Sequence, residues 1–302
     1  MRIAVPDLIS NSYFPAVAAA ELGCLRDEGI AAQIELLFPV DAAYRALAAG
    51  EVDVVAGSAH SALAAFPEWR GVKLLAAQGQ GMYWFLVMRA DLRAGRNDVS
   101  VVAGKRIGAA PWVDLGLRQL LVDAGIDLRE VDISPVPGAA GAGTNFGLTA
   151  ARALADGKID GFWANGMGAE VAVRSGAGTV VLDVRRGDGP EGCFDYTFAS
   201  LAATEAFVTA DADRAQAIVR GLRRAQEQLA DDPERATAVG ERVFPPEQAS
   251  LIADLVRRDV PYYDAEIPRR AISGMNRFAR EQGLLAGDPP YEQIVAMDVN
   301  RS

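Results

Sequence analysis

The chain has 302 residues, of which 50% are hydrophobic, and a formal net charge of −10. This length allows one large domain or two modest ones with a substantial core. The negative charge argues against nucleic acid or an anionic membrane surface as a partner. Two cysteines, Cys24 and Cys193, are too few for a disulfide framework.

The first predicted elements alternate between short β-rich runs and helices. Residues 2–7 are a predicted strand, and the stretch from Ser10 to Pro15 leads from it into a helix over 15–23. Ser12 or a neighbour is expected to cap this helix, and Pro15 suits its first turn. The other elements predicted up to residue 88 are strands over 34–37, 52–56, 72–77 and 84–88, a helix over 42–49 capped by Asp41, and a helix over 59–66. The alternation indicates a mostly parallel α/β sheet.

The plan of the first hundred residues then repeats. Arg106-Ile107-Gly108 echoes Arg2-Ile3-Ala4, and the run 152–160 echoes the run 45–53 as a helix end, a glycine and a strand with an aspartate near its start. The offsets are 104 positions (from Arg2 to Arg106) and 107 positions (from Gly50 to Gly157), so both order and spacing recur. Coincidence in an alanine-rich sequence is the alternative. We interpret the repeat as two lobes built on one plan.

The second half of the chain begins with further strands and ends in helices. After a polar segment over 91–100, we expect strands over 106–109, 130–135, 159–163 and 179–182 and an extended run over 194–203. Asp211 can cap a helix that reaches Leu229 and carries apolar residues on one face. Helices over 247–258 and 264–283 follow, and we expect them to cover the first lobe. The predicted domains are therefore 1–88 plus 200–302 for lobe 1 and 89–199 for lobe 2.

Four segments of the sequence resemble a known family. They are the loop SNSYFPA with the helix that ends in ELGCLRDEGI, the run RALAAGEVDVVAGSAHSAL, the segments WFLVMRADL and GKRIGAA, and the run over 199–236. Together they resemble the nitrate/sulfonate/taurine and thiamine-precursor type of substrate-binding protein from ABC importers. The resemblance implies a periplasmic binding protein-like II fold, with two α/β lobes, a two-strand hinge and a ligand cleft between them.

The resemblance leaves two classes of function open. The first is a binding protein, expected to be monomeric, that delivers a sulfonate, carboxylate or heteroaromatic ligand to an ABC permease. The second is an intracellular enzyme on the same scaffold, similar to a decarboxylase or a pyrimidine-precursor synthase. The synthase's cysteine-rich stretch has no counterpart here. Since no signal peptide is visible, we expect a periplasmic or cell-surface location if a leader was removed, and a cytoplasmic one if Met1 is the native start.

The resemblance places ligand-binding groups at strand ends and helix starts that face the cleft, in line with the rule for open α/β sheets. The residues expected there are Ser10, Asn11, Tyr13, Ser58, His60, Gln80, Tyr83, Trp112, Thr144, Asn145, Trp163 and Asn165. They are neutral hydrogen-bonding and aromatic residues, which suit a ligand with an apolar body and one polar or anionic end. We expect free backbone N–H groups near Tyr13, Ser58 and Asn145 to hold that end.

His60 is the single histidine of the chain. It is either a cleft residue that binds ligand, a catalytic base, or a polar residue in the first turn of a helix. We expect its side chain in or beside the cleft, so that replacing it by alanine weakens ligand binding and leaves the fold intact. No nucleophile elbow and no aspartate suited to orient the imidazole are evident, so no catalytic residue is assigned.

Two further features of the sequence are candidate sites. The run from Gly138 to Asn145 lacks the lysine and the glycine spacing of a phosphate-binding loop, so we interpret it as a flexible loop that can close over a ligand. For Trp112 and Trp163, packing in the core is the alternative to ligand contact. No cluster has metal-ligand spacing, and we expect neither a metal nor a cofactor.

Overall fold

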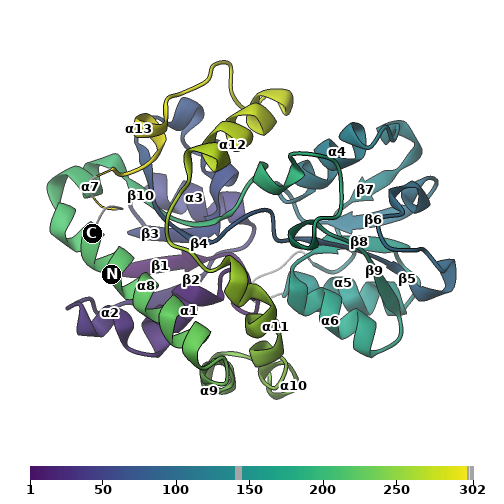
Figure 1. The fold of residues 1–302 in the computed structure, drawn as a ribbon, viewed down its shortest axis with the longest axis horizontal. Helices are drawn as coiled ribbons and strands as arrows, with labels where there is room; N and C mark the ends of the chain where they lie inside the picture. The colour runs from purple at the N-terminus through teal and green to yellow at the C-terminus, as the bar shows by residue number, and fades with distance from the viewer. Residues whose placement is uncertain (140–144, 298, 300–302) are drawn as a thin grey trace. The chain divides into compact units, whose positions relative to one another are not determined.

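The computed structural model describes residues 1–139, 145–297 and 299 of the chain. It divides into two compact units, which we call unit 1 (Met1–Gly81 with Asp195–Ser302) and unit 2 (Met82–Phe194). The chain passes between them at 81/82 and 194/195, a few residues before the boundaries expected at 88/89 and 199/200. Each unit has its own five-stranded sheet with helices packed against it (Figure 1). The predicted α/β fold class is confirmed.

The sheet of unit 1 has the strand order β2-β1-β3-β10-β4. Strand β1 pairs in parallel with β2 and β3, while β10 runs antiparallel between β3 and β4. The bounds are β1 Arg2–Val5, β2 Gln33–Leu36, β3 Val54–Ser58, β4 Val72–Gly79 and β10 Ala199–Thr204. All but β10 therefore run in one direction, as the mostly parallel pattern predicts.

The sheet of unit 2 repeats this arrangement with the order β7-β6-β8-β5-β9. Here β5 is the strand that runs antiparallel to both of its neighbours. The bounds are β5 Phe85–Arg89, β6 Arg106–Ala109, β7 Asp132–Ser134, β8 Gly161–Ala164 and β9 Gly178–Asp183. The assignment of the strand over 84–88 to the first lobe is wrong, because this strand completes the second sheet.

The sequence repeat corresponds to a repeated set of hydrogen bonds. In unit 1 the backbone N–H of Arg2 donates to Asp53 Oδ2 at 2.6 Å, and in unit 2 that of Arg106 donates to Asp160 Oδ2 at 3.0 Å. In each copy the arginine guanidinium also donates to a glycine carbonyl. This glycine, Gly50 or Gly157, ends the helix that comes just before the aspartate in the chain. The two sheets therefore share one local construction, as the repeat predicts.

The helices of unit 1 include the long helix α8, which packs against α1 and α2 (Figure 1). Asp211 caps α8 as predicted, and Ala215, Ile218 and Leu222 are buried on its inner face. The bounds in unit 1 are α1 Phe14–Glu21, α2 Cys24–Asp27, α3 Val40–Ala48, α7 Glu205–Ala210, α8 Ala212–Asp231, α9 Arg235–Val243, α10 Pro246–Ala249, α11 Ile252–Asp259, α12 Arg269–Glu281 and α13 Tyr291–Ile294.

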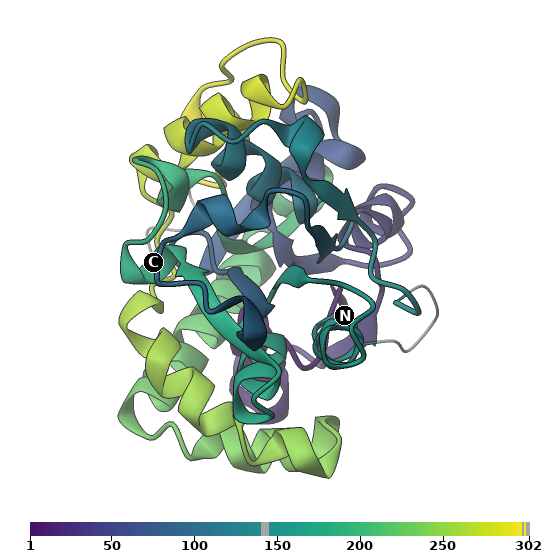
Figure 2. The same cartoon turned by 90° about the vertical axis from the view of Figure 1, so that its right-hand side faces the viewer.

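The helices described in unit 2 are α4 Asp114–Asp123, α5 Phe146–Ala155 and α6 Gly166–Arg174. Helices α5 and α6 are in close contact and are labelled next to each other in Figure 1, while Figure 2 shows the same fold turned by 90°. A Cβ atom added to Gly168 would lie only 2.7 Å from the carbonyl oxygen of Gly147. The two backbones therefore touch where glycine leaves room for them.

Three local predictions are wrong. Ser12 does not cap α1. The residue at the cap position is Tyr13, and its side chain makes no capping hydrogen bond. Asp41 lies inside the first turn of α3 and pairs with Arg45. The predicted helix over 59–66 is a 3-10 helix over Ala59–Ala64, which we call η1.

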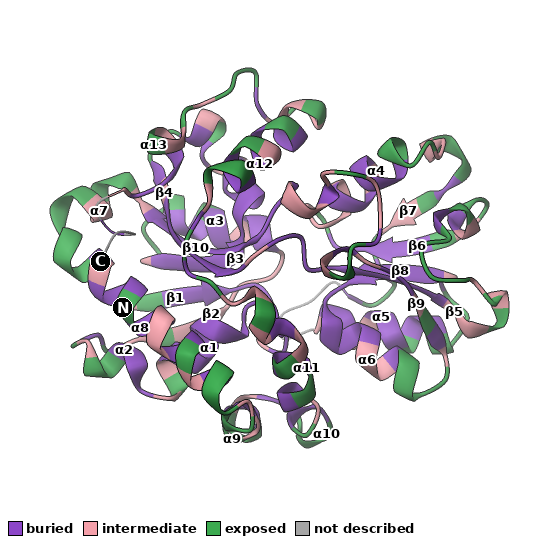
Figure 3. Cartoon of the chain, in the orientation of Figure 1, coloured by how far each residue is buried: buried purple, intermediate pink, exposed green. Residues whose placement is uncertain are grey.

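The inner strands of both sheets are mostly buried, whereas the edge strands β2 and β7 are partly exposed, as are the outer faces of the helices (Figure 3). Among the described residues, no helix has the length and apolar character needed to cross a membrane.

Candidate functional site

The predicted site residues of unit 1 lie where the parallel strands of its sheet end. The turn Ser10–Tyr13 follows β1, Ser58 ends β3, and Gln80 follows β4. We call this border of the sheet edge A. The ends of parallel strands are where open α/β sheets bind ligands, because backbone and loop groups converge there.

The N–H groups at edge A are already engaged in the turn that leads into α1. Ile9 N–H donates to Asp7 Oδ1 and Ser12 N–H to Ser10 Oγ, at 3.2 and 3.3 Å. Ala16 N–H, in the first turn of α1, donates to Gln78 Oε1 at 3.2 Å. The expectation of free N–H groups near Tyr13 is therefore wrong for these donors, because nearby side chains accept from them.

Asn11 and Ser12 are buried polar residues of this turn, with 1% and 3% of their surface exposed. Asn11 Nδ2 donates to the carboxylate of Asp259, at the end of α11, with a distance of 2.6 Å. Asn11 Oδ1 and Ser12 Oγ have no hydrogen-bond partner within the described residues. Edge A thus holds two buried oxygen atoms that the chain itself does not satisfy.

His60 belongs to a buried network of hydroxyl groups. Its Nδ1 lies 2.9 Å from Thr197 Oγ1, and its Nε2 lies 3.5 Å from Ser61 Oγ. Ser61 Oγ in turn lies 2.6 Å from Ser58 Oγ. The imidazole is fully buried and meets the ring of Phe278 edge-on at 5.4 Å. These contacts tie η1, the segment before β10 and α12 together.

Two glutamines behind edge A hold elements of unit 1 in place. Gln78 is fully buried and donates to the carbonyl of Ser200 while accepting from Ala16. Gln80 donates to the carbonyls of Asp264 and Glu266 at 3.0 and 2.7 Å. The Nε2 group of Gln80 is therefore engaged with the backbone.

In unit 2 the corresponding border of the sheet, which we call edge B, is aromatic. The rings of Tyr83 and Trp84 lie 4.8 Å apart, and those of Trp84 and Trp163 lie 6.2 Å apart. The guanidinium of Arg185 lies 5.7 Å from the centre of the Tyr83 ring, within range of a cation–π contact. Trp163 is fully buried, and its indole Nε1–H has no acceptor among the described residues.

Trp112 follows β6 in an unusual backbone conformation. Its φ angle is 69°, in the left-handed region that bulky side chains rarely adopt. Its side chain is half-buried. Strain of this kind persists only where the surroundings impose it, and such residues cluster at functional sites.

Asn145 and Asn165 act as helix caps. Asn145 Oδ1 accepts from Leu148 N–H at 2.9 Å, and Asn165 Oδ1 accepts from Gly168 N–H at 3.1 Å. The N–H group of Leu148 in the first turn of α5 is thus engaged, contrary to the expectation of free donors near Asn145. Thr144, which was predicted to bind ligand, and most of the predicted loop lie outside the described residues.

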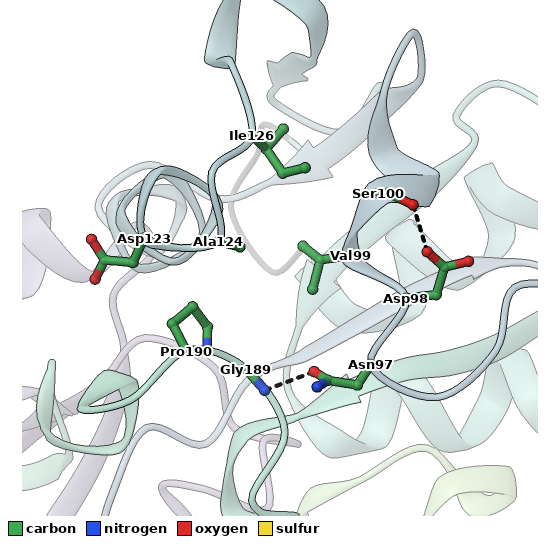
Figure 4. Close-up of a pocket in the computed structure, with 9 residues that line it drawn as sticks. All are labelled: Asn97, Asp98, Val99, Ser100, Asp123, Ala124, Ile126, Gly189 and Pro190. Atoms are coloured by element: carbon green, nitrogen blue, oxygen red, sulfur yellow. Dashed lines mark hydrogen bonds between the residues drawn. The ribbon is translucent and has the colours of Figure 1, made fainter.

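A surface pocket of about 410 Å³ lies elsewhere in unit 2 (Figure 4). Asn97 Oδ1 accepts from Gly189 N–H at 2.8 Å, and Asp98 Oδ1 accepts from Ser100 at 2.6 Å. The carboxylates of Asp98 and Asp123 point away from each other (Figure 4). None of the predicted site residues lines this pocket, and its two acids do not form a joint binding site.

Sequence reasoning missed the buried partners of the predicted residues. Thr197, Gln78 and Asp259 are brought to edge A by tertiary packing, and no motif or spacing marks them. Burial raises the pKa of Tyr44, whose hydroxyl donates to the carbonyl of Ser58 at 3.0 Å. Among residues 1–139 and 145–297, no group of three or more His, Cys, Asp or Glu side chains could hold a metal ion.

Solved structures with the same fold include binding proteins and an enzyme. The alkanesulfonate-binding protein SsuA from Xanthomonas axonopodis pv. citri bound to MOPS has a TM-score of 0.73 and 15% identity, covering 97% of each chain. The periplasmic nitrate-binding protein NrtA from Synechocystis PCC 6803 has a TM-score of 0.75 and 13% identity, covering 99% of this chain and 86% of its own. The desulfurization enzyme DSZB has a TM-score of 0.64 and 15% identity, covering 99% of both chains.

Sequence comparison gives the family. No curated protein matches the chain significantly. The family model described as "NMT1/THI5 like" matches residues 10–236, which is most of the chain. The protein belongs to the NMT1/THI5-like family.

Proposed function

We propose that this protein binds a small organic ligand, a sulfonate, carboxylate or heteroaromatic compound, and delivers it to an ABC-type importer. Membership of the NMT1/THI5-like family supports the proposal. So do the names of three proteins with the same fold, which are an alkanesulfonate-binding protein, a periplasmic nitrate-binding protein and the ligand-binding component of an ABC-type import system. In this proposal residues of edge A and residues of edge B are each candidates for ligand contact.

The observation that carries the proposal is Trp112. Holding a tryptophan at a φ of 69° costs on the order of 1–3 kcal/mol. Its side chain is only half-buried, so internal packing recovers just part of that cost. A ligand that stacks on the exposed part of the indole accounts for the conformation. The position of Trp112 directly after β6, where this type of sheet binds ligands, agrees with that explanation.

The aromatic character of edge B favours an organic ligand over an inorganic ion. The half-buried Trp112 offers a flat surface that can cover an apolar or aromatic ligand body with little loss of side-chain entropy, while Tyr83 is buried beside Trp84. Trp163 offers a buried N–H donor to a polar group. Of the predicted residues, Ser58, His60 and Gln80 then support the site through the hydrogen bonds described above.

The partner in this proposal is an ABC permease, and the place of action is the periplasm or the cell surface. The protein acts as a monomer. Fractionation of cells that express the full gene tests the location, and light scattering on the purified protein tests the oligomeric state.

A thermal-shift screen tests the function. The purified protein is heated with sulfonates, aromatic carboxylates, pyrimidines and nitrate, because a ligand that binds the folded state raises the melting temperature by mass action. We expect an organic compound to raise it in a concentration-dependent way. Stabilisation by nitrate alone contradicts an aromatic-lined site, and stabilisation by no compound contradicts the proposed ligand classes.

A further inference from the structure

The turn between β1 and α1 contains two buried oxygen atoms that the rest of the chain does not satisfy. Asn11 Oδ1 and Ser12 Oγ lack a hydrogen-bond partner within the described residues, although Asn11 is 1% and Ser12 3% exposed. A buried polar atom left unpaired costs about 1–3 kcal/mol, so native proteins pair nearly all of them with protein, water or ligand. Two consecutive exceptions at the border of a sheet mark a place where a polar group from outside the chain binds.

The chemistry of that group follows from the orientation of the Asn11 amide. Its Nδ2 lies 2.6 Å from a carboxylate oxygen of Asp259. A carboxylate accepts hydrogen bonds, so the amide nitrogen must face it. The unpaired atom of Asn11 is therefore the carbonyl oxygen, which can only accept. Ser12 Oγ can accept as well as donate.

Five backbone donors of the turn are already engaged. The N–H groups of Ile9 and Ser12 donate to side-chain oxygens, and those of Ser10, Tyr13 and Phe14 donate to backbone carbonyls within the turn. An anionic group needs donors, and these five have none to spare.

The charge around the turn is also unsuited to an anion. Asp7 and Asp259 are 8% and 2% exposed, and each carboxylate already accepts a hydrogen bond from this turn. Arg258, the neighbour of Asp259 on α11, sets one positive charge against these two carboxylates and already has interactions of its own within the chain. A sulfonate or carboxylate at this turn would meet acceptors and negative charge, which is unfavourable in a buried site.

We infer that the ligand carries a hydrogen-bond-donating group, an amino or hydroxyl group, which binds at Asn11 Oδ1 and Ser12 Oγ. This inference rests on the proposed function. It reverses the expectation that the anionic end of a ligand binds at the start of α1. An anionic end, if the ligand has one, binds away from this turn.

The first test compares two serines of the turn in the protein without added ligand. Ser10 Oγ accepts from Ser12 N–H, so Ser10→Ala removes a bond and should lower the melting temperature. Ser12→Ala removes an oxygen that has no partner in the chain, so it should leave the melting temperature unchanged or raise it. An equal loss in both variants would show that a resident water molecule or an internal contact satisfies Ser12, and would overturn the inference.

The second test uses pairs of compounds that differ by one amino group. The pairs are taurine with ethanesulfonate, 4-aminobenzoate with benzoate, and 4-aminopyrimidine with pyrimidine. Within a pair that binds, the amino compound should bind at least about fivefold more tightly to the wild type, the effect of one hydrogen bond. The preference should disappear in Ser12→Ala, which keeps the rest of the turn.

The outcomes separate the two proposals. If the compounds without an amino group bind as well or better, or if Ser12→Ala keeps the preference, the inference is wrong and the proposed function stands. If no compound of either kind binds, both are contradicted. Tighter binding of the amino compound, lost in Ser12→Ala, supports both.

Discussion

Trp112 is held at a φ of 69° directly after β6, with its side chain half-buried. Tryptophan in this conformation is strained, whereas glycine adopts it without a steric penalty. The strain and the side chain can therefore be separated by mutation. Alanine keeps most of the strain and removes the indole, while glycine removes both.

We predict that Trp112→Ala weakens ligand binding by about 1–3 kcal/mol, in line with the apolar area that an aromatic side chain covers. Trp112→Gly should lose similar affinity but be more stable than Trp112→Ala by about 1 kcal/mol. Calorimetric titration and denaturant unfolding of both variants measure the two effects. Trp112→Phe is the control and should keep most of the affinity. Unchanged affinity in Trp112→Ala would place this residue outside the site.

His60 supports edge A from within the core of unit 1. Its ring contacts Thr197, Ser61 and Phe278, and its side chain is fully buried. Removing it leaves a cavity and takes a partner from a buried hydroxyl. We therefore predict that His60→Ala lowers the free energy of unfolding by about 2–4 kcal/mol. Thr197→Val, which removes only the hydroxyl partner, should cost less. If His60→Ala is as stable as the wild type but binds ligand less well, the earlier expectation of a purely ligand-binding role is correct.

At the scale of elements, the sequence predicts which segments are strands and helices better than it predicts their partners. The strands β5 and β10 have the composition of ordinary β-strands, and their residues do not indicate which of the two sheets they join. The sheet that a strand joins is decided by its pairing with distant segments, and this pairing cannot be predicted from a single sequence. The repeat was visible because an arginine, a helix-ending glycine and an aspartate recur in order, and these residues make equivalent local bonds in both units.

For the candidate site, too, the sequence predicts the positions of residues better than it predicts their partners. Strand ends place Asn11, Ser58 and Trp112 at the sheet borders, and a βα pattern is sufficient to find them. Whether a capping residue binds the helix or a ligand depends on its rotamer and its neighbours. Asn145 and Asn165 cap their helices, while Ser12, the predicted cap, does not. The buried partners Asp259 and Thr197 come from distant segments and carry no signal in the sequence.

The contact between α5 and α6 depends on glycine at position 168. A Cβ atom there would lie 2.7 Å from a backbone oxygen and 2.8 Å from a backbone carbon of Gly147. We predict that Gly168→Ala destabilises the protein by about 1–3 kcal/mol, because the helices must move apart. Gly287→Ala is the control, since nothing lies within 4 Å of its Cβ position, and it should be neutral or slightly stabilising. Equal stability of the two variants, measured by denaturant unfolding, would argue against this packing.

The pairing of Asp160 makes the stability of unit 2 depend on pH. A hydrogen bond from Arg106, with the charge of Arg89 nearby, holds the pKa of Asp160 below its ordinary value of 3.8. Because the folded-state pKa is lowered, the ionised carboxylate stabilises the fold above pH 3.8, and this contribution is lost as the pH falls through the lowered pKa.

We predict that the unfolding free energy falls less steeply between about pH 4.5 and about pH 2.5 in Asp160→Asn than in the wild type. Asp156→Asn is the control, because its pair with Lys158 is exposed and should matter little. Parallel acid limbs for Asp160→Asn and the wild type would show that this carboxylate does not contribute to acid sensitivity.

At the scale of the whole molecule, two units with the same strand order present different chemistry at corresponding borders of their sheets. Edge A is polar and rich in acceptors, while edge B is aromatic. Edge A suits a donating polar group of a ligand, and edge B suits a flat or apolar body. The fold occurs both in binding proteins and in a desulfurization enzyme, so the decisive question is whether a bound compound leaves the protein unchanged.

Isothermal titration calorimetry of the wild-type protein answers this, with the compound that stabilises it most in the thermal-shift screen and with mass analysis of the recovered ligand. The proposed function predicts saturable binding of one ligand per chain and recovery of the compound chemically unchanged. Recovery of a converted product would contradict it and identify the protein as an enzyme. A titration without saturable heat would show that the compound is not a ligand.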